Sequence, residues 1–259
     1  MVVAVDRLRK RENVDFAMQR IRAVNAASQG RHSRPIMGPS IHTISARRRS
    51  QLRTQFLAWH RSECPLDDRA IDRLLGINST IVEKRLTLRN LKPYSGDYNL
   101  RYEGVPYAVV RAVLRWAKVD RRDVFYDLGA GHGRTLFYGA LTTPARFCGI
   151  EIVPQRLAAM NLVRQRLGLE SVAIRGGNVC DEPFEDGTIF FLFNPFFRPS
   201  LRRVGERLGG LARHKSLRIA TVAIWEPYFA TRPWLREDLQ PVALDAVARR
   251  YGLRLFSSH

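Results

Sequence analysis

The sequence predicts an α/β fold in which a doubly wound, mostly parallel sheet carries helices on both faces. Short apolar runs of strand length recur between residues 124 and 257, and segments with helical periodicity separate them. Strands that alternate with helices in this way pair in parallel and lie buried between two helical layers. The first third of the chain is mostly helical in pattern. We therefore expect a helical N-terminal extension over residues 1–93 and a sheet domain over residues 94–259.

The extension is basic, and its helical parts are separated by a linker. Apolar residues at helical spacing predict a helix over residues 12–24. Residues 25–50 are rich in Ser, Gly, Pro and Arg and predict a linker that ends in the basic run Arg47–Arg49. Apolar residues over 71–86 predict two further short helices with an interruption near Gly76. A basic arm of this kind is expected to bind RNA or an acidic protein surface.

The sheet domain alternates between helix and strand. A helix is expected from Pro106 to Trp116, because proline favours the start of a helix. The expected strands are short apolar runs bounded by turn residues: 124–129, 146–152, 171–176, 188–194, 217–224 and a final hairpin of two strands within 240–257. Three more helices are expected between them, over 134–142, 154–167 and 199–211. The result is a seven-stranded sheet.

Composition narrows the functional classes. The 259 residues carry 43 Lys and Arg against 24 Asp and Glu, and residues 1–60 hold twelve of the basic and three of the acidic ones. The net charge of +19 attracts RNA, DNA or an acidic protein face, although arginine also serves as an ordinary solvating residue. A hydrophobic content of 45% supports a packed core. The longest apolar runs are too short for a membrane span, and the first eleven residues lack a secretory apolar stretch, so we expect a cytoplasmic protein.

The cysteines and histidines predict no metal centre. Cys64, Cys148 and Cys180 are widely spaced and form no CxxC pair, and the six histidines are scattered along the chain. This pattern argues against a disulfide framework and against a structural zinc site. Cys148 and Cys180 stand among apolar neighbours, which indicates core thiols.

The loop after the first expected strand is the most informative segment. It runs Asp127-Leu-Gly129-Ala-Gly131-His-Gly133-Arg134. Glycines let a backbone pass close to a ligand, and ligands of doubly wound sheets bind beyond the carboxyl ends of the strands. Arg134 stands where the third glycine of a dinucleotide-binding loop would fall, which disfavours an NAD-type cofactor.

This loop, with an acidic residue two positions before its first glycine, resembles the first motif of class I S-adenosylmethionine-dependent methyltransferases. Their sheet has seven strands with the last pair antiparallel. Glu151 ends the second strand, where a carboxylate can accept both ribose hydroxyls. Asn178 follows the third strand, where the family contacts the adenine amino group, and Asp181 is a second candidate there. The resemblance covers about residues 94–257 and implies S-adenosylmethionine as cofactor, held by Asp127, Gly129, Gly131, Glu151 and Asn178.

The fourth strand ends in Asn194-Pro195-Phe196-Phe197. This is similar to the Asn/Asp-Pro-Pro-aromatic tetrapeptide of amino-group methyltransferases, in which the Asn oxygen and a backbone carbonyl accept hydrogen bonds from the acceptor NH₂ and the ring stacks on a planar acceptor. Phe196 replaces the second proline, which puts recognition of a planar base in doubt. The non-SET lysine methyltransferases are also similar, since their fourth strand ends in an Asn before an aromatic-rich turn. The resemblance implies catalytic roles for Asn194, Pro195 and Phe196.

Two further segments are candidates for covering the site. Half of the eight tyrosines lie at 94, 98, 102 and 107, and they alternate with glycines as in a closing lid. A comparable loop of the non-SET lysine enzymes folds over the methionine part of the cofactor and has a Glu near its end, which Glu103 matches. Packing of a linker against the sheet is the alternative. Aromatic residues expected around the acceptor are Phe196, Phe197, Trp225 and Tyr228, with Glu226 as a candidate base.

These features predict a cytoplasmic S-adenosylmethionine-dependent N-methyltransferase that acts on a macromolecule. The lid and the Asn-Pro-Phe sequence favour protein lysine as the acceptor, and the charge and the tetrapeptide favour an RNA base. A non-catalytic RNA- or ribosome-binding protein that retains the fold is the alternative from another class. The presence of Gly129, Gly131, Glu151 and Asn194 argues against it, because such a protein has no physical need for all four.

Overall fold

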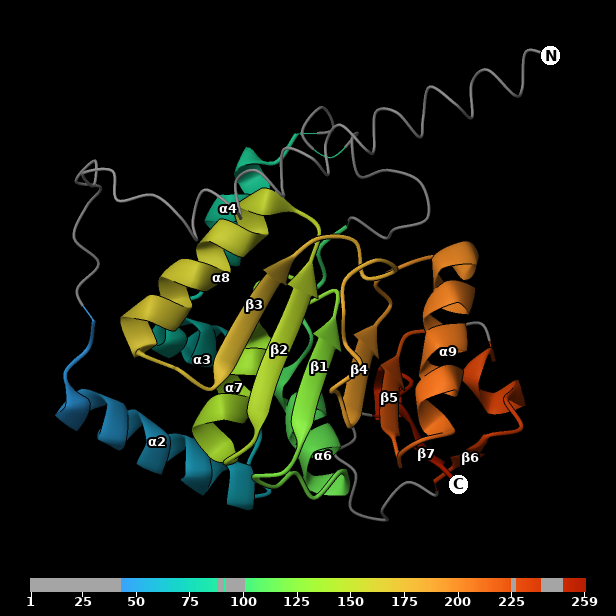
Figure 1. The fold of residues 1–259 in the computed structure, drawn as a ribbon. Helices are drawn as coiled ribbons and strands as arrows, with labels where there is room; N and C mark the ends of the chain where they lie inside the picture. Colours follow the sequence, from blue (N-terminus) through green and yellow to red (C-terminus); the bar gives the residue numbers. More distant parts are fainter. Residues whose placement is uncertain (1–42, 88–90, 92–100, 225–226, 239–248) are drawn as a thin grey trace, which may run out of the picture.

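The computed structural model describes residues 43–87, 91, 101–224, 227–238 and 249–259. Its centre is a seven-stranded sheet with the order β3-β2-β1-β4-β5-β7-β6 (Figure 1). The first five strands run parallel, and β7 is antiparallel to both of its neighbours, β5 and β6. The strands are β1 Val124–Leu128, β2 Arg146–Glu151, β3 Val172–Gly176, β4 Ile189–Phe193, β5 Arg218–Val222, β6 Leu235–Glu237 and β7 Arg254–Ser258. The predicted doubly wound sheet is confirmed.

The central strands are apolar because both of their faces are covered. All five residues of β1 are buried, and alternate residues point to opposite sides. Phe125 and Phe191 pack into the layer that contains helices α6 Tyr107–Trp116, α7 Arg134–Thr142 and α8 Pro154–Leu167. Tyr126 and Phe190 pack into the opposite layer, which contains α9 Arg198–Ala212 and the short 3₁₀ helix η2 Phe229–Thr231.

Three N-terminal helices belong to the first of these layers. They are α2 Ala46–Arg61, α3 Asp68–Leu75 and α4 Ser79–Arg85. Leu52 and Phe56 of α2, and Ile71 and Leu75 of α3, are buried in the same core as α6, α7 and α8. Figure 1 shows α2 across the ends where β1–β3 begin, and α4 beside α8 near the ends where they finish. The domain boundary at residue 93 therefore stays a prediction.

Several predicted elements are confirmed. Helices α7 and α8 have the predicted bounds, and the two short helices before residue 86 appear as α3 and α4, with Gly76 in a left-handed conformation at φ 76° between them. The predicted helix over 12–24 lies outside the described residues.

Two predictions are wrong. The linker over 25–50 does not extend to residue 50, because α2 begins at Ala46 and contains Arg47–Arg49; the side chain of Ser45 caps it by accepting a hydrogen bond from the Arg48 amide. The C-terminal hairpin does not lie within 240–257, because β7 pairs with β6, which precedes that range.

In the described part of the chain, no helix is long and apolar enough to cross a membrane. No group of three potential metal-ligating side chains is found in this part of the chain. Cys148 and Cys180 are buried and unpaired, and Cys64 is exposed and unpaired, as expected for free thiols.

Candidate functional site

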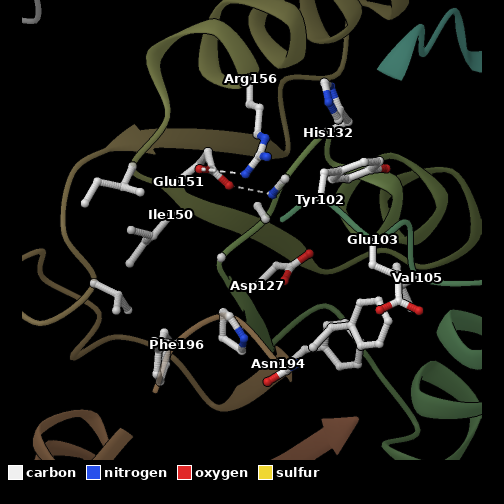
Figure 2. Close-up of a pocket in the computed structure, with 18 of the residues that line it drawn as sticks. Tyr102, Glu103, Val105, Asp127, His132, Ile150, Glu151, Arg156, Asn194 and Phe196 are labelled. Carbon is white, nitrogen blue, oxygen red and sulfur yellow. Dashed lines mark hydrogen bonds and ion pairs between the residues drawn. The ribbon is translucent and has the colours of Figure 1, made fainter. Parts of the chain in front are cut away.

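A cavity opens at the carboxyl ends of β1, β2 and β4. Ligands of doubly wound sheets bind at these strand ends. Figure 2 shows Asp127 in the middle of the site, with Glu151, Glu103 and Asn194 around it. The lining includes eight of the nine residues predicted for catalysis or cofactor binding: Glu103, Asp127, Gly129, Gly131, Glu151, Asn194, Pro195 and Phe196.

The glycine loop forms the floor of this cavity. The amides of Gly129 and Ala130 both donate to the carbonyl of Ile150, at 2.9 and 3.0 Å, which fixes the loop on β2. Gly129 and Gly131 have φ angles of 96° and 56°, a region that other residues rarely adopt. A side chain at Gly131 would place its Cβ 3.0 Å from the Tyr102 ring. The loop therefore needs glycine for its conformation and for the space above it.

Glu151 is held in place by two backbone amides. Its Oε2 accepts from Gly131 at 2.8 Å, and its Oε1 accepts from Val153 at 2.8 Å. Burial raises the pKa of Glu151, while Arg156 and these amides oppose the shift. An ionised carboxylate has about four acceptor positions, so these amides leave acceptor capacity for a hydroxyl donor.

Asp127 is buried at the end of β1. Burial raises the pKa of this carboxyl to about 7, with the neighbouring Thr135 hydroxyl opposing the shift and the charge of Glu151 adding to it. The side chain therefore titrates near neutral pH. A cation in the cavity would stabilise its ionised form.

Asn194 has strained backbone geometry where β4 ends. Its φ angle is 41°, and its amide donates to the Val222 carbonyl on β5 at 3.1 Å. A residue with positive φ costs of order 1–3 kcal/mol, and such residues cluster at functional sites. The next residue, Pro195, packs against Gly129, so the β4 turn and the glycine loop fit each other closely.

Among the nine residues predicted for catalysis or cofactor binding, Asn178 is the one that does not line the cavity. Its Oδ1 accepts from the amide of Cys180 at 2.8 Å and so closes the turn after β3. Its neighbour Val179 lines the cavity instead. Asp181 lies on the surface with Arg203 at 3.2 Å.

Comparison with known proteins adds a relative. A protein-lysine N-methyltransferase from Saccharolobus islandicus is 29% identical over 109 residues, which cover 39% of this chain and 68% of the relative. No protein-family model matches the chain. The seven-stranded sheet, with β7 antiparallel to its neighbours, has the Rossmann-like fold of the class I S-adenosylmethionine-dependent methyltransferases, and the name of this relative agrees with the resemblance of the loops.

Solved structures with a similar fold include two methyltransferases. An RNA methyltransferase from Salinibacter ruber, crystallised with S-adenosylhomocysteine, is 24% identical, with a TM-score of 0.43 over 60% of this chain and 92% of its own. A methyltransferase from Geobacter sulfurreducens is 14% identical, with a TM-score of 0.48 over 80% of this chain and 97% of its own.

The predicted lid is only partly described. Tyr94 and Tyr98 lie outside the described residues. Tyr102 covers the glycine loop, with its ring edge-on to His132 at a centroid distance of 4.6 Å. Tyr107 belongs to α6 and is fully buried, where its hydroxyl donates to Asp72 at 2.8 Å.

Of the aromatic residues predicted around the acceptor, only some line the cavity. Phe196 lines the cavity and is 6% exposed, whereas Phe197 is 53% exposed and does not line it. Tyr228 is buried against α9 and is also absent from the lining. Trp225 and Glu226 lie outside the described residues.

The cavity lining also contains charged residues for which the sequence patterns predicted no role. Arg134 pairs with Asp72 of α3 through hydrogen bonds of 3.0 and 2.5 Å, and Arg156 of α8 pairs with Glu83 of α4 at 2.8 and 3.0 Å. Both arginines line the cavity. Each pair joins residues more than 60 positions apart, so no local spacing marks it.

Proposed function

We propose that this methyltransferase transfers the methyl group of S-adenosylmethionine to the side-chain amine of a protein lysine. One observation carries the proposal: the cavity places the carboxylate of Glu103 and the Asn194 turn together and leaves Phe197 outside. A carboxylate suits a lysine ammonium, whereas a nucleobase bound beside Asn194 needs the ring at the aromatic position of the tetrapeptide, here Phe197, to face the cavity. The Saccharolobus islandicus relative carries the same activity in its name.

The residues present fit the cofactor. We expect Glu151 to accept the ribose hydroxyls, because its carboxylate is fixed at the cavity and has acceptor capacity left. Gly129 and Gly131 allow close approach of the cofactor chain, and Asp127 supplies negative charge for its ammonium group. Asn178 keeps a second lone pair on its side-chain oxygen for the adenine amine, beside Val179.

The cavity walls favour the reactive form of lysine. A lysine amine has a pKa of about 10.4 in water, and burial lowers that value by disfavouring the charged form. Phe191, Phe193 and Phe196 supply apolar wall here. When bound, S-adenosylmethionine would supply the methyl group on its cationic sulfur. The neutral lysine nitrogen would take that group while the sulfur keeps the bonding electrons, and the methylated amine would release its proton. The protein contributes mainly alignment of the two reactants.

An RNA base is the second candidate acceptor, favoured by the net charge of +19. In either case the basic N-terminal segment would add long-range attraction to an acidic macromolecule. The same charge argues against a small metabolite as acceptor.

The acceptor is tested by labelling. The purified protein is incubated with cell lysate and S-adenosylmethionine labelled on the methyl group, and the product is then digested with ribonuclease or with protease. Label that survives ribonuclease, is released by protease and elutes as methyllysine after hydrolysis supports the proposal. Label that ribonuclease releases assigns an RNA acceptor instead. Asn194→Ala serves as the control and is expected to lose labelling while it still binds S-adenosylhomocysteine.

A further inference from the structure

A single carboxylate from the N-terminal helices reaches two parts of the cofactor site. Glu83 of α4 lies 2.8 Å from His132 of the glycine loop through its Oε1. The same carboxylate pairs with Arg156, with Nε to Oε1 at 2.8 Å and Nη2 to Oε2 at 3.0 Å. Glu83 therefore ties the glycine loop and the start of α8 together.

Arg156 stands between two carboxylates. Its Nη1 lies 3.9 Å from Oε1 of Glu151, while its Nε and Nη2 donate to Glu83. The side chains of Arg156 and Glu151 are each 5% exposed, so water screens their attraction poorly. Figure 2 shows the guanidinium of Arg156 directed at Glu151, while Glu151 also holds the loop amide. The position of Arg156 therefore reflects a balance between Glu83 and Glu151.

The ionisation of Glu83 fits this role. Burial opposes ionisation, but the hydrogen bonds from Arg156 and His132 hold the pKa of Glu83 below its usual value. The carboxylate is therefore charged at neutral pH and competes for Arg156 throughout the working range.

We propose that Glu83 is a positioning residue that keeps Arg156 away from Glu151 and so leaves the Glu151 carboxylate available to the ribose hydroxyls of the cofactor. If the charge of Glu83 is removed, Arg156 is attracted to Glu151 alone, whose carboxylate already lies 3.9 Å away. A close pair between them would occupy the acceptor positions that the ribose needs. The inference rests on the proposed contact between Glu151 and the ribose.

The test compares two ligands by calorimetry: S-adenosylhomocysteine and its 2′-deoxy analogue, which lacks one hydroxyl. The wild-type protein is expected to prefer S-adenosylhomocysteine by about tenfold. Glu83→Gln is expected to weaken S-adenosylhomocysteine by about tenfold more than the analogue, which keeps only one of the two hydroxyls. The double variant E83Q/R156Q removes the competing cation and is expected to regain most of the preference. Glu63→Gln is the matched control, since it breaks an exposed pair with Arg115 in the same N-terminal region.

The outcomes separate the inference from the proposed function. If the wild-type protein prefers S-adenosylhomocysteine and E83Q keeps that preference, the inference is overturned and the proposed function stands. Equal loss of both ligands in E83Q indicates a merely structural role and also overturns it. A wild-type protein that binds neither ligand overturns both proposals. If E83Q does not fold in thermal melts, the double variant E83Q/R156Q provides the test. Loss of the preference for S-adenosylhomocysteine in that variant would contradict the proposed competition between Glu83 and Glu151 for Arg156.

Discussion

Cofactor affinity is expected to depend on pH through Asp127. Burial raises the pKa of this carboxyl to about 7, so the free protein carries mostly the neutral acid below that pH. The ammonium group of the cofactor favours the ionised form. Binding therefore releases a proton below pH 7, and affinity rises as the pH increases through 7 and then levels off.

The magnitude follows from the ionised fraction. With a pKa of about 7, roughly one Asp127 in eleven is ionised at pH 6 and most are ionised at pH 8, so the dissociation constant of S-adenosylhomocysteine is expected to be about tenfold larger at pH 6. Glu151, whose pKa burial also raises, and His132, whose pKa burial lowers, line the same cavity. Asp127→Asn is needed to assign the effect.

Calorimetry from pH 6 to 8, in two buffers with different ionisation enthalpies, measures both the affinity and the released proton. Asp127→Asn is expected to bind more weakly at pH 8 and to lose the pH dependence, while Asp181→Asn, at an exposed surface pair, keeps it. A variant D127N with the pH profile of the wild-type protein would refute the assignment. The stability of the free protein is expected to change with pH in the opposite direction. Because the pKa of Asp127 is raised in the folded state, its contribution to the free energy of unfolding is complete below about pH 4 and is lost as the pH rises through 7.

Three further predictions test the site. Gly131→Arg is expected to weaken S-adenosylhomocysteine at least about tenfold in calorimetry, because φ is 56° there and the Tyr102 ring lies over it; unchanged binding would contradict the cavity as the cofactor site. Arg134→Met leaves Asp72 buried without its cation and is expected to cost about 3–5 kcal/mol in denaturant unfolding; a change below 1 kcal/mol would contradict that role. Phe197→Ala is expected to keep methylation of a protein acceptor within about twofold, because an exposed ring outside the cavity adds little; a large loss in kcat/KM would indicate base stacking.

Local start and stop signals explain why the helices of the sheet domain could be predicted closely. Helix α7 starts after a glycine loop, and α8 starts at Pro154 and ends before Gly168, which are residues that favour helix ends. Helix α2 offers no such pattern. Its sixteen residues bury only Leu52 and Phe56 among many arginines, so its periodicity is too weak to distinguish it from a linker.

The residues of the candidate site also differ in whether local sequence marks them. Residues on strand ends and loops, such as Asp127, Glu151 and Asn194, could be predicted because the topology of a parallel sheet brings strand ends together. Glu83 could not, since its partner Arg156 lies 73 positions further along the chain. Only the packing of α4 beside α8 brings the two side chains within reach.

Some of the arginines that contribute to the net charge hold the N-terminal helices in place. Arg111 of α6 donates to the carbonyls of Trp59, Ser62 and Cys64, at 3.3, 3.0 and 2.9 Å, where α2 ends. Arg115 adds hydrogen bonds to the same chain end. The C-terminus of a helix carries partial negative charge, so these guanidinium groups fasten the N-terminal helices to the sheet domain.

Carbonyls carry no net charge, so these arginines still contribute to the long-range field of the molecule. Their guanidinium groups, however, are held in place and cannot move to contact a phosphate. Close contacts with an acidic partner must therefore come from other, exposed arginines such as Arg47, Arg48 and Arg53 on α2. Figure 1 places α2 at the edge of the sheet opposite the strand ends that form the cavity. An acceptor that uses both surfaces would have to span the molecule, which favours a large partner over a short peptide or a single nucleotide.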